Sequence, residues 1–135
     1  MNHLELSAQL KWDVNSSKGV YVDAAYHSYV LDSLATYSYR PTFEASLNAY
    51  YSIANKFVLN ACLKSEMGRS HLANTTDLVA VELNDIIDLD LSIEYKYNKV
   101  ISANLKARNL FGGYEIWENY SVLSPLIQFS VSYQY

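Results

Sequence analysis

The fold is decided by residues 87–97, with the sequence IDLDLSIEYKY, in which apolar and polar side chains alternate without a break. Ile87 and Leu89 stand on one side of this pattern, and Asp88 and Asp90 stand on the other. Successive side chains of a β-strand point to opposite faces. The strict two-residue period therefore predicts a strand with one apolar and one polar face.

The same period recurs in six further segments, so we expect seven strands. The other six are residues 4–14, 20–30, 43–51, 57–66, 101–108 and 127–135. Each has about ten residues, the length that a tilted strand needs to cross a bilayer. Strands of soluble domains more often have about five or six. Residues 77–83, in which Val79, Val81 and Leu83 alternate, are either an eighth strand or, as we prefer, an extension of the strand at 87–97.

The connections between these segments alternate in length. The short ones are residues 15–19, 53–56 and 98–99, and the long ones are residues 32–41, 68–86 and 110–125. Outer-membrane barrels have short periplasmic turns on one rim and longer extracellular loops on the other. We therefore expect an all-β, antiparallel up-and-down meander in which residues 1–135 form a single segment, the C-terminal part of a transmembrane β-barrel.

Seven strands place the two termini on opposite rims, whereas a complete bacterial barrel has an even number of strands. We therefore expect the barrel to continue upstream of Met1. The first residues show no cationic segment and no apolar core, so we expect no signal peptide in this chain.

The amino-acid composition excludes some classes of function for this chain. The 135 residues include 13 Tyr, 4 Phe and 2 Trp, and aromatic residues favour both strands and membrane interfaces. No apolar run approaches the roughly 20 residues of a membrane-spanning helix. A net charge of −4 without a basic cluster argues against nucleic acid as a partner. The single cysteine, Cys62, excludes an internal disulfide and a thiolate zinc site. Composition alone leaves a soluble β-sandwich open.

The two faces of the strands have different surroundings in a membrane barrel and in a soluble β-sheet. In a barrel the apolar face meets lipid and the polar face lines the lumen, whereas in a soluble sheet the apolar face is core. The candidates for the lumen-facing side, on neighbouring strands, are Asp88, Asp90, Glu94, Lys96, Lys106 and Arg108, whose charges we expect to neutralise one another. An aromatic girdle at the periplasmic ends is expected from Tyr95, Tyr97, Tyr133 and Tyr135.

No constellation of residues predicts catalysis, a cofactor or a metal. His3, His27 and His71 lie in separate segments without metal-ligand spacing. Ser70 precedes His71 in a long connection, and no partner acid can be assigned, so we expect no enzyme. The long connections also carry aromatic residues that either contact a partner or pack the loops: Tyr37, Tyr39, Tyr114, Trp117 and Tyr120.

Five stretches of the last hundred residues resemble, in order and spacing, the C-terminal part of the Bacteroidetes TonB-dependent receptors and related outer-membrane β-barrel proteins. They are YRPTFEA (39–45), DLDLSIEYKYNK (88–99), ISANLKARNLF (101–111), YEIW (114–117) and FSVSYQY (129–135). The plug and the TonB-contacting motif of those receptors have no counterpart here. The resemblance therefore implies nutrient uptake for a parent receptor or transporter rather than for this segment alone.

The end strand resembles the insertion signal that the barrel-assembly machinery reads. Its residues are Phe129, Val131, Tyr133 and Tyr135. The resemblance thus implies a location in the bacterial outer membrane. The implied partners are outer-membrane lipid, the barrel-assembly machinery and the remainder of the parent barrel. The alternative is a soluble β-sheet binding or interaction module.

Overall fold

The structure, a computed structural model, describes residues 2–30, 40–74, 79–117, 120–122 and 125–134. Every regular element in these ranges is a β-strand. The described residues contain no helix of the length and apolarity that crossing a membrane requires.

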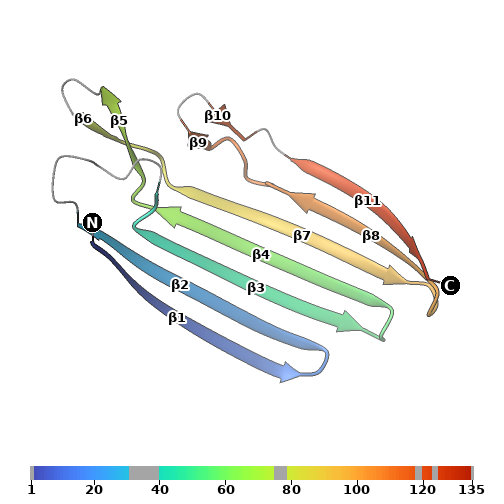
Figure 1. The fold of residues 1–135 in the computed structure, drawn as a ribbon. Coiled ribbons are helices and arrows are strands. Elements are labelled where there is room, and N and C mark those ends of the chain that lie inside the picture. The colour runs from blue at the N-terminus through green and yellow to red at the C-terminus, as the bar shows by residue number, and fades with distance from the viewer. Residues whose placement is uncertain (1, 31–39, 75–78, 118–119, 123–124, 135) are drawn as a thin grey trace.

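Seven long strands form one antiparallel sheet, in the order β1-β2-β3-β4-β7-β8-β11 (Figure 1). Their bounds are β1 Asn2–Asn15, β2 Lys18–Val30, β3 Phe43–Ile53, β4 Phe57–Met67, β7 Ile86–Lys96, β8 Ile101–Arg108 and β11 Leu126–Tyr133. The predicted seven-stranded meander is confirmed. The sheet is open, because β1 and β11 are its edges and do not pair with each other in the described part of the chain.

Four short strands lie in the long connections. β5 (Ser70–Asn74) pairs with β6 (Val79–Glu82), and β9 (Glu115–Trp117) pairs with β10 (Tyr120–Ser121). The preferred extension of residues 87–97 is seen with an interruption: residues 83–85 lie outside any strand, and β6 belongs to a separate two-stranded sheet. The β5–β6 hairpin nevertheless keeps the register of β4 with β7, because Ser70 stands opposite Glu82 and the Leu83 N–H donates to the Arg69 carbonyl at 2.9 Å. Gly68, with a φ of 67°, lies at the interruption.

The short connections are tight turns at the opposite end of the sheet. The Asn15 side chain accepts hydrogen bonds from the backbone N–H groups of Ser17 and Lys18, at 2.8 and 3.1 Å. Asn98 does the same for Val100 and Ile101, at 2.8 and 2.7 Å. These turns hold the register of each hairpin, and therefore decide which side chains share a face.

The turn between β3 and β4 has a different chemistry. Its two central residues, Ala54 and Asn55, have φ values of 50° and 54°, and the Lys56 N–H donates to the Ile53 carbonyl at 3.0 Å. Positive φ at both central positions is the geometry of a type I′ hairpin turn, whose twist matches that of the strands.

The turns define two ends of the sheet, which we call the short-turn rim (residues 15–18, 53–57 and 97–101) and the long-loop rim at the other ends of the same strands. The N-terminus lies at the long-loop rim and the C-terminus at the short-turn rim (Figure 1). The expected placement of the termini on opposite rims is thus seen.

The described part of the chain has almost no apolar core. Its buried apolar side chains are Pro41 and Ile86, and Ile86 has 6% of its surface exposed. The accessible surface is 9805 Å². A compact monomer of this mass would expose about 7,200 Å². The long strands therefore form a single layer, and neither of its faces is covered by a second sheet in the described part of the chain.

Candidate functional site: apolar face, polar face and loop cluster

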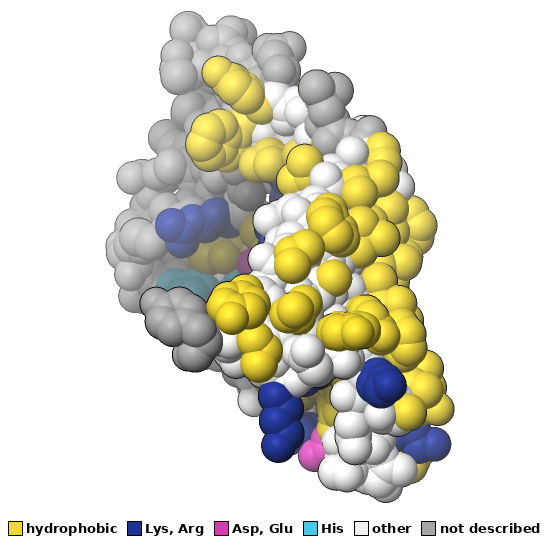
Figure 2. All heavy atoms as spheres, turned by 90° about the vertical axis from the view of Figure 1, so that its right-hand side faces the viewer, with side chains coloured by type: hydrophobic (Ala, Val, Ile, Leu, Met, Phe, Trp, Pro, Cys, Tyr) yellow, Lys and Arg dark blue, Asp and Glu magenta, His cyan; other side chains and the backbone are white. Residues whose placement is uncertain are grey.

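The pairing register gathers the apolar residues of all seven strands on one side. One row across four strands consists of Leu59, Ile93, Leu105 and Phe129. Such rows repeat along the strands and form what we call the apolar face. Figure 2 shows hydrophobic side chains gathered in a broad band over this part of the molecule. A shallow hollow of about 490 Å³ crosses the face, over the small side chains of Ala49 and Ala61.

The side chains of the apolar face are exposed. Leu6 is 71% exposed, and Trp12 and Phe129 are each 67% exposed. In a β-sandwich these side chains would be covered by the facing sheet, at a spacing of about 10 Å. No such layer exists among the described residues, so the sandwich arrangement is not seen.

Aromatic side chains collect where the apolar face approaches the short-turn rim. They include Trp12, Tyr51, Phe57, Tyr95, Tyr97 and Tyr133. The rings of Phe57 and Tyr95 lie 4.8 Å apart, whereas Tyr97 and Tyr133 are 65% and 66% exposed. Tyr95, Tyr97 and Tyr133 thus lie at the predicted end, and Tyr135 lies outside the described residues.

The height of the apolar face can be compared with a membrane. β3 has 11 residues, from Phe43 to Ile53. Ten steps of about 3.3 Å make a strand of about 33 Å, and a tilt of about 40° reduces this to about 25 Å along the membrane normal. The outward apolar band of outer-membrane barrels is also about 25 Å tall.

The opposite side of the sheet is the polar face. A hollow of about 560 Å³ on this face extends over β1 to β4. The Ser46 hydroxyl donates to Asp23 at 3.1 Å, and the Asn48 amide donates to Ser46 at 3.2 Å. Lys64 forms an ion pair with Asp90 at 3.2 Å. Polar groups thus satisfy one another across strands instead of being spread singly over the surface.

The six candidates for the lumen-facing side fall into three groups. Asp90, Lys106 and Arg108 line a hollow of about 190 Å³, beside Cys62. Glu94 and Lys96 line another of about 280 Å³ at the short-turn rim. Asp88 alone is buried, with 5% exposed.

The expected mutual neutralisation of these six charges is only partly seen. The ion pair of Asp90 is with Lys64 of β4, which is not among the six. The cross-strand neighbours of Glu94 are Val58 and Asn104, which carry no charge. The sequence does not reveal this, because the partner depends on which residue of the adjacent strand stands opposite.

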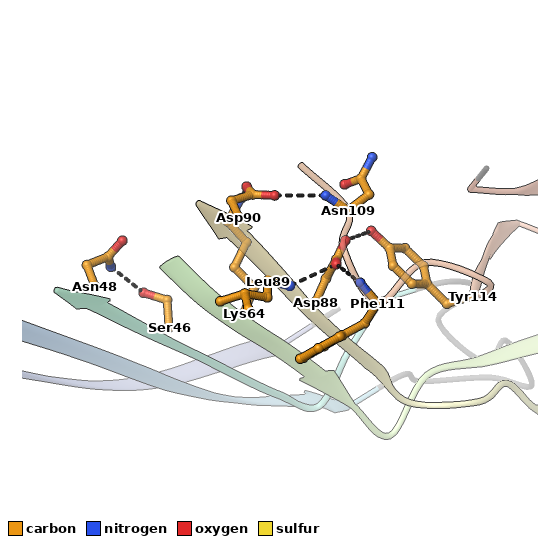
Figure 3. A network of polar contacts seen from close by, with 9 residues as sticks. All are labelled: Ser46, Asn48, Lys64, Asp88, Leu89, Asp90, Asn109, Phe111 and Tyr114. Atoms are coloured by element: carbon orange, nitrogen blue, oxygen red, sulfur yellow. Dashed lines mark hydrogen bonds and ion pairs between the residues drawn. The ribbon is translucent and has the colours of Figure 1, made fainter. Parts of the chain in front are cut away.

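Asp88 holds a loop to the sheet. Its carboxylate accepts hydrogen bonds from the N–H groups of Leu89 and Phe111, at 2.8 and 3.2 Å, and from the Tyr114 hydroxyl at 2.8 Å (Figure 3). Burial, together with the neighbouring Asp88 carboxylate, raises the pKa of Tyr114 to about 12. A buried carboxylate with several donors is satisfied, so this arrangement favours a structural clamp over a cation site.

Arg69 completes the tie between the long connections. It is 2% exposed, and its guanidinium donates to the carbonyls of Asn84, Glu115 and Ile116, at 3.2, 2.6 and 3.2 Å. These bonds join the β5–β6 hairpin region to the segment after β8. Nothing in the sequence singles out Arg69, because its partners are backbone carbonyls 15 to 47 residues away. We call the residues held by Arg69 and Asp88 the loop cluster: Arg69, Asn84, Asp88, Phe111, Tyr114, Glu115 and Ile116.

His3 and His27, which lie in separate segments without metal-ligand spacing, come together in the structure. The β1–β2 register sets Glu5 opposite His27 and His3 opposite Tyr29. His3 Nε2 therefore lies 3.3 Å from His27 Nδ1. The spacing of these residues along the sequence does not reveal the group, because its members come from different strands. His71 is buried elsewhere, in β5.

Ser70 and His71 lie next to each other in β5, rather than in an irregular loop. Adjacent residues of a strand point to opposite faces, so this pair is not arranged as a nucleophile and its base. Among the loop aromatics, Trp117 and Tyr120 meet edge to face at 6.0 Å, whereas Tyr37 and Tyr39 lie outside the described residues.

The end strand β11 carries Phe129, Val131 and Tyr133 on the apolar face, opposite Leu105, Ala103 and Ile101 of β8. Its other edge pairs with no strand among the described residues.

Comparison of the chain with family models, with curated proteins and with solved structures found no match.

Proposed function

We propose that this chain is the C-terminal strand segment of an outer-membrane β-barrel, a TonB-dependent receptor-like transporter for nutrient uptake, without catalytic activity. The observation that carries the proposal is the apolar face, which extends over all seven long strands and is exposed. Acyl chains are the surroundings that such a face requires, because its side chains then leave water without needing a second protein layer.

The distribution of burial supports the same function. The large apolar side chains of the sheet are exposed, whereas Arg69, His71 and Asp88 are buried among the described residues. Soluble proteins show the opposite order. A lipid-facing band with a polar interior accounts for both observations.

The open edges of the sheet support a larger barrel. Unpaired backbone groups at a strand edge are costly in lipid, so β1 and β11 each require a partner strand. The remainder of the parent barrel would supply both. The alternating apolar residues and the Tyr133 ring of β11 suit it as the strand that the assembly machinery engages.

A soluble β-sheet interaction module is the alternative. It would need a partner or a further domain to cover the whole apolar face, since exposed patches beyond a few hundred square ångströms lead to association. No observation on the described residues favours such a covering layer.

The test is a comparison of two adjacent positions in β7. In a Cys62→Ser background incorporated into phospholipid vesicles, Leu91→Cys places a thiol on the apolar face and Ser92→Cys places one on the polar face. We expect a water-soluble maleimide to label the second thiol and to spare the first. Equal labelling of both, or a chain that stays monomeric in buffer without detergent, contradicts the proposal.

A further inference from the structure

The polar face carries a group of histidine and glutamate side chains at the long-loop rim. His3 and Glu5 come from β1, and His27 comes from β2. Their nearest ligand-type atoms all lie within 4.8 Å of one another. His3 Nε2 is 3.3 Å from His27 Nδ1, and Glu5 Oε2 is 4.0 Å from the same His27 atom. Three side chains from two strands therefore converge on one point.

From this convergence we propose that His3, Glu5 and His27 form a binding site for a transition-metal dication of the Zn²⁺ class. Two nitrogens bound tetrahedrally at about 2.0–2.1 Å from Zn²⁺ lie about 3.3–3.4 Å apart. The separation of His3 and His27 matches this value. Imidazole selects zinc, copper or nickel over calcium and magnesium, which require oxygen ligands.

The position of Glu44 in β3 is a second observation that favours a metal site. The His27 ring has two nitrogens, and while Nδ1 faces His3 and Glu5, Nε2 lies 3.7 Å from Glu44 Oε1. A carboxylate beside the second nitrogen of a metal-bound histidine can accept its N–H, which holds the tautomer and the ring orientation. The Nε2 of His27 is buried without a hydrogen-bond partner among the described residues, and Glu44, just beyond hydrogen-bond distance, is placed to take that N–H when a metal occupies Nδ1.

The surroundings restrain the two histidine rings, whereas the Glu5 side chain is 52% exposed. The His27 side chain is 12% exposed, so its ring has little freedom. The His3 ring stacks on Tyr29 with a centroid distance of 4.9 Å and an interplanar angle of 8°. The register also sets Glu44 opposite Glu66, which adds negative charge beside the site.

Three protein ligands leave a fourth position. Glu5 and Glu44 line the hollow of about 560 Å³ on the polar face, so that position faces open space. Such a site exchanges its ion or takes a fourth ligand from a passing molecule, in contrast to closed four-ligand structural sites. The site needs only the register of β1 to β3, so it does not rest on the proposed membrane function.

The experiment is a titration of the full chain with Zn²⁺, followed by calorimetry, and with Co²⁺, whose visible absorption reports tetrahedral coordination. It is done in detergent or in buffer, in whichever medium far-ultraviolet circular dichroism shows the sheet. We expect His3→Gln and His27→Gln each to weaken binding by more than about 100-fold, and Glu44→Gln to weaken it by about 10–100-fold.

The matched control is Glu94→Gln, a polar-face carboxylate outside the group, which we expect to leave the affinity unchanged. His71→Gln is a second control of the same kind, because His71 lies outside the group, and we expect it also to leave the affinity for Zn²⁺ unchanged. The proposal is overturned if the folded chain binds no Zn²⁺, or if the His3 and His27 variants bind as tightly as the parent. Because His3 is an exposed edge-strand residue, its variant keeps the test decisive even if His27→Gln perturbs the sheet.

Discussion

The sheet and the loop cluster are built on opposite principles. In the sheet, large apolar side chains such as Leu6 and Phe129 are exposed, and the strands are joined by regular backbone pairing. In the loop cluster, Arg69 and Asp88 are buried. Arg69 donates hydrogen bonds to backbone carbonyls, and Asp88 accepts hydrogen bonds from backbone N–H groups. One region leaves its apolar side chains uncovered, and the other encloses its charges.

The difference shows which surroundings each region requires. A buried charge is stabilised by hydrogen-bond partners, and the loop cluster supplies them to the Asp88 carboxylate and to both terminal nitrogens of Arg69, though not to its Nε. The sheet is different, because its apolar face has no cover within the described part of the chain. The loop cluster thus encloses its charges within the protein, whereas the apolar face of the sheet still needs a cover, which the proposed membrane location would supply.

The largest expected effect comes from a charge placed on the apolar face. Leu91→Arg puts a guanidinium at the middle of β7. In a bilayer this should destabilise the sheet, lowering its free energy of unfolding by about 2–4 kcal/mol. Urea unfolding in phospholipid vesicles measures this. Ser92→Arg, one residue along on the polar face, should change the stability by less than about 1 kcal/mol. Equal losses from both substitutions would remove the distinction between the faces.

A smaller effect is expected in the loop cluster. Arg69→Met removes the donors to the carbonyls of Asn84, Glu115 and Ile116, and should lower the opening free energy of residues 110–117 by about 2–3 kcal/mol. Hydrogen exchange of these residues measures the change, and the protection of β3 and β4 should stay the same. Arg108→Met, an exposed arginine of β8, is the control. Unchanged exchange in the Arg69 variant would mean that the guanidinium does not hold the cluster.

The pKa of Tyr114 gives a prediction of its own, and this residue lies outside the long strands. Because its folded pKa is raised to about 12, its contribution to stability is complete below pH 10 and is lost as the pH rises through about 12. Asp88→Asn should move this pKa part of the way back toward 10, since burial remains. Absorbance at the wavelength of tyrosinate, with Tyr114→Phe as the reference, follows the ionisation. An unchanged late step in Asp88→Asn would exclude the carboxylate as a cause.

The smallest expected effect concerns the turn between β3 and β4. Ala54→Gly should raise stability by about 0.5–1 kcal/mol, because Ala54 has a φ of 50° that glycine adopts without steric cost. Urea unfolding of the sheet checks this. Asn55→Gly should change stability less, since asparagine tolerates the left-handed region. A loss of stability in Ala54→Gly would show that the turn relaxes in solution.

The strands of the sheet were predictable and the contacts between distant residues were not. An unbroken two-residue period, as in residues 87–97, depends only on neighbours along the chain, so it predicts β7 and its two faces directly. The extension toward β6 was predicted from its alternation, but the interruption at residues 83–85 and the partner strand β5 were missed, because alternation along one segment does not show where its pairing is broken or which residues stand opposite. The His3–Glu5–His27 group and the Arg69 contacts were missed because register and backbone carbonyls leave no pattern in the sequence.

The most direct test of whether the apolar face meets lipid uses the two tryptophans as an internal comparison. Trp12 lies on the apolar face and is 67% exposed, and Trp117 lies in β9 and is 55% exposed. In vesicles of lipids with brominated acyl chains, fluorescence of the Trp117→Phe variant reports Trp12, and that of the Trp12→Phe variant reports Trp117. We expect strong quenching of Trp12 and little quenching of Trp117. Equal quenching of the two, or none for Trp12, would contradict this expectation.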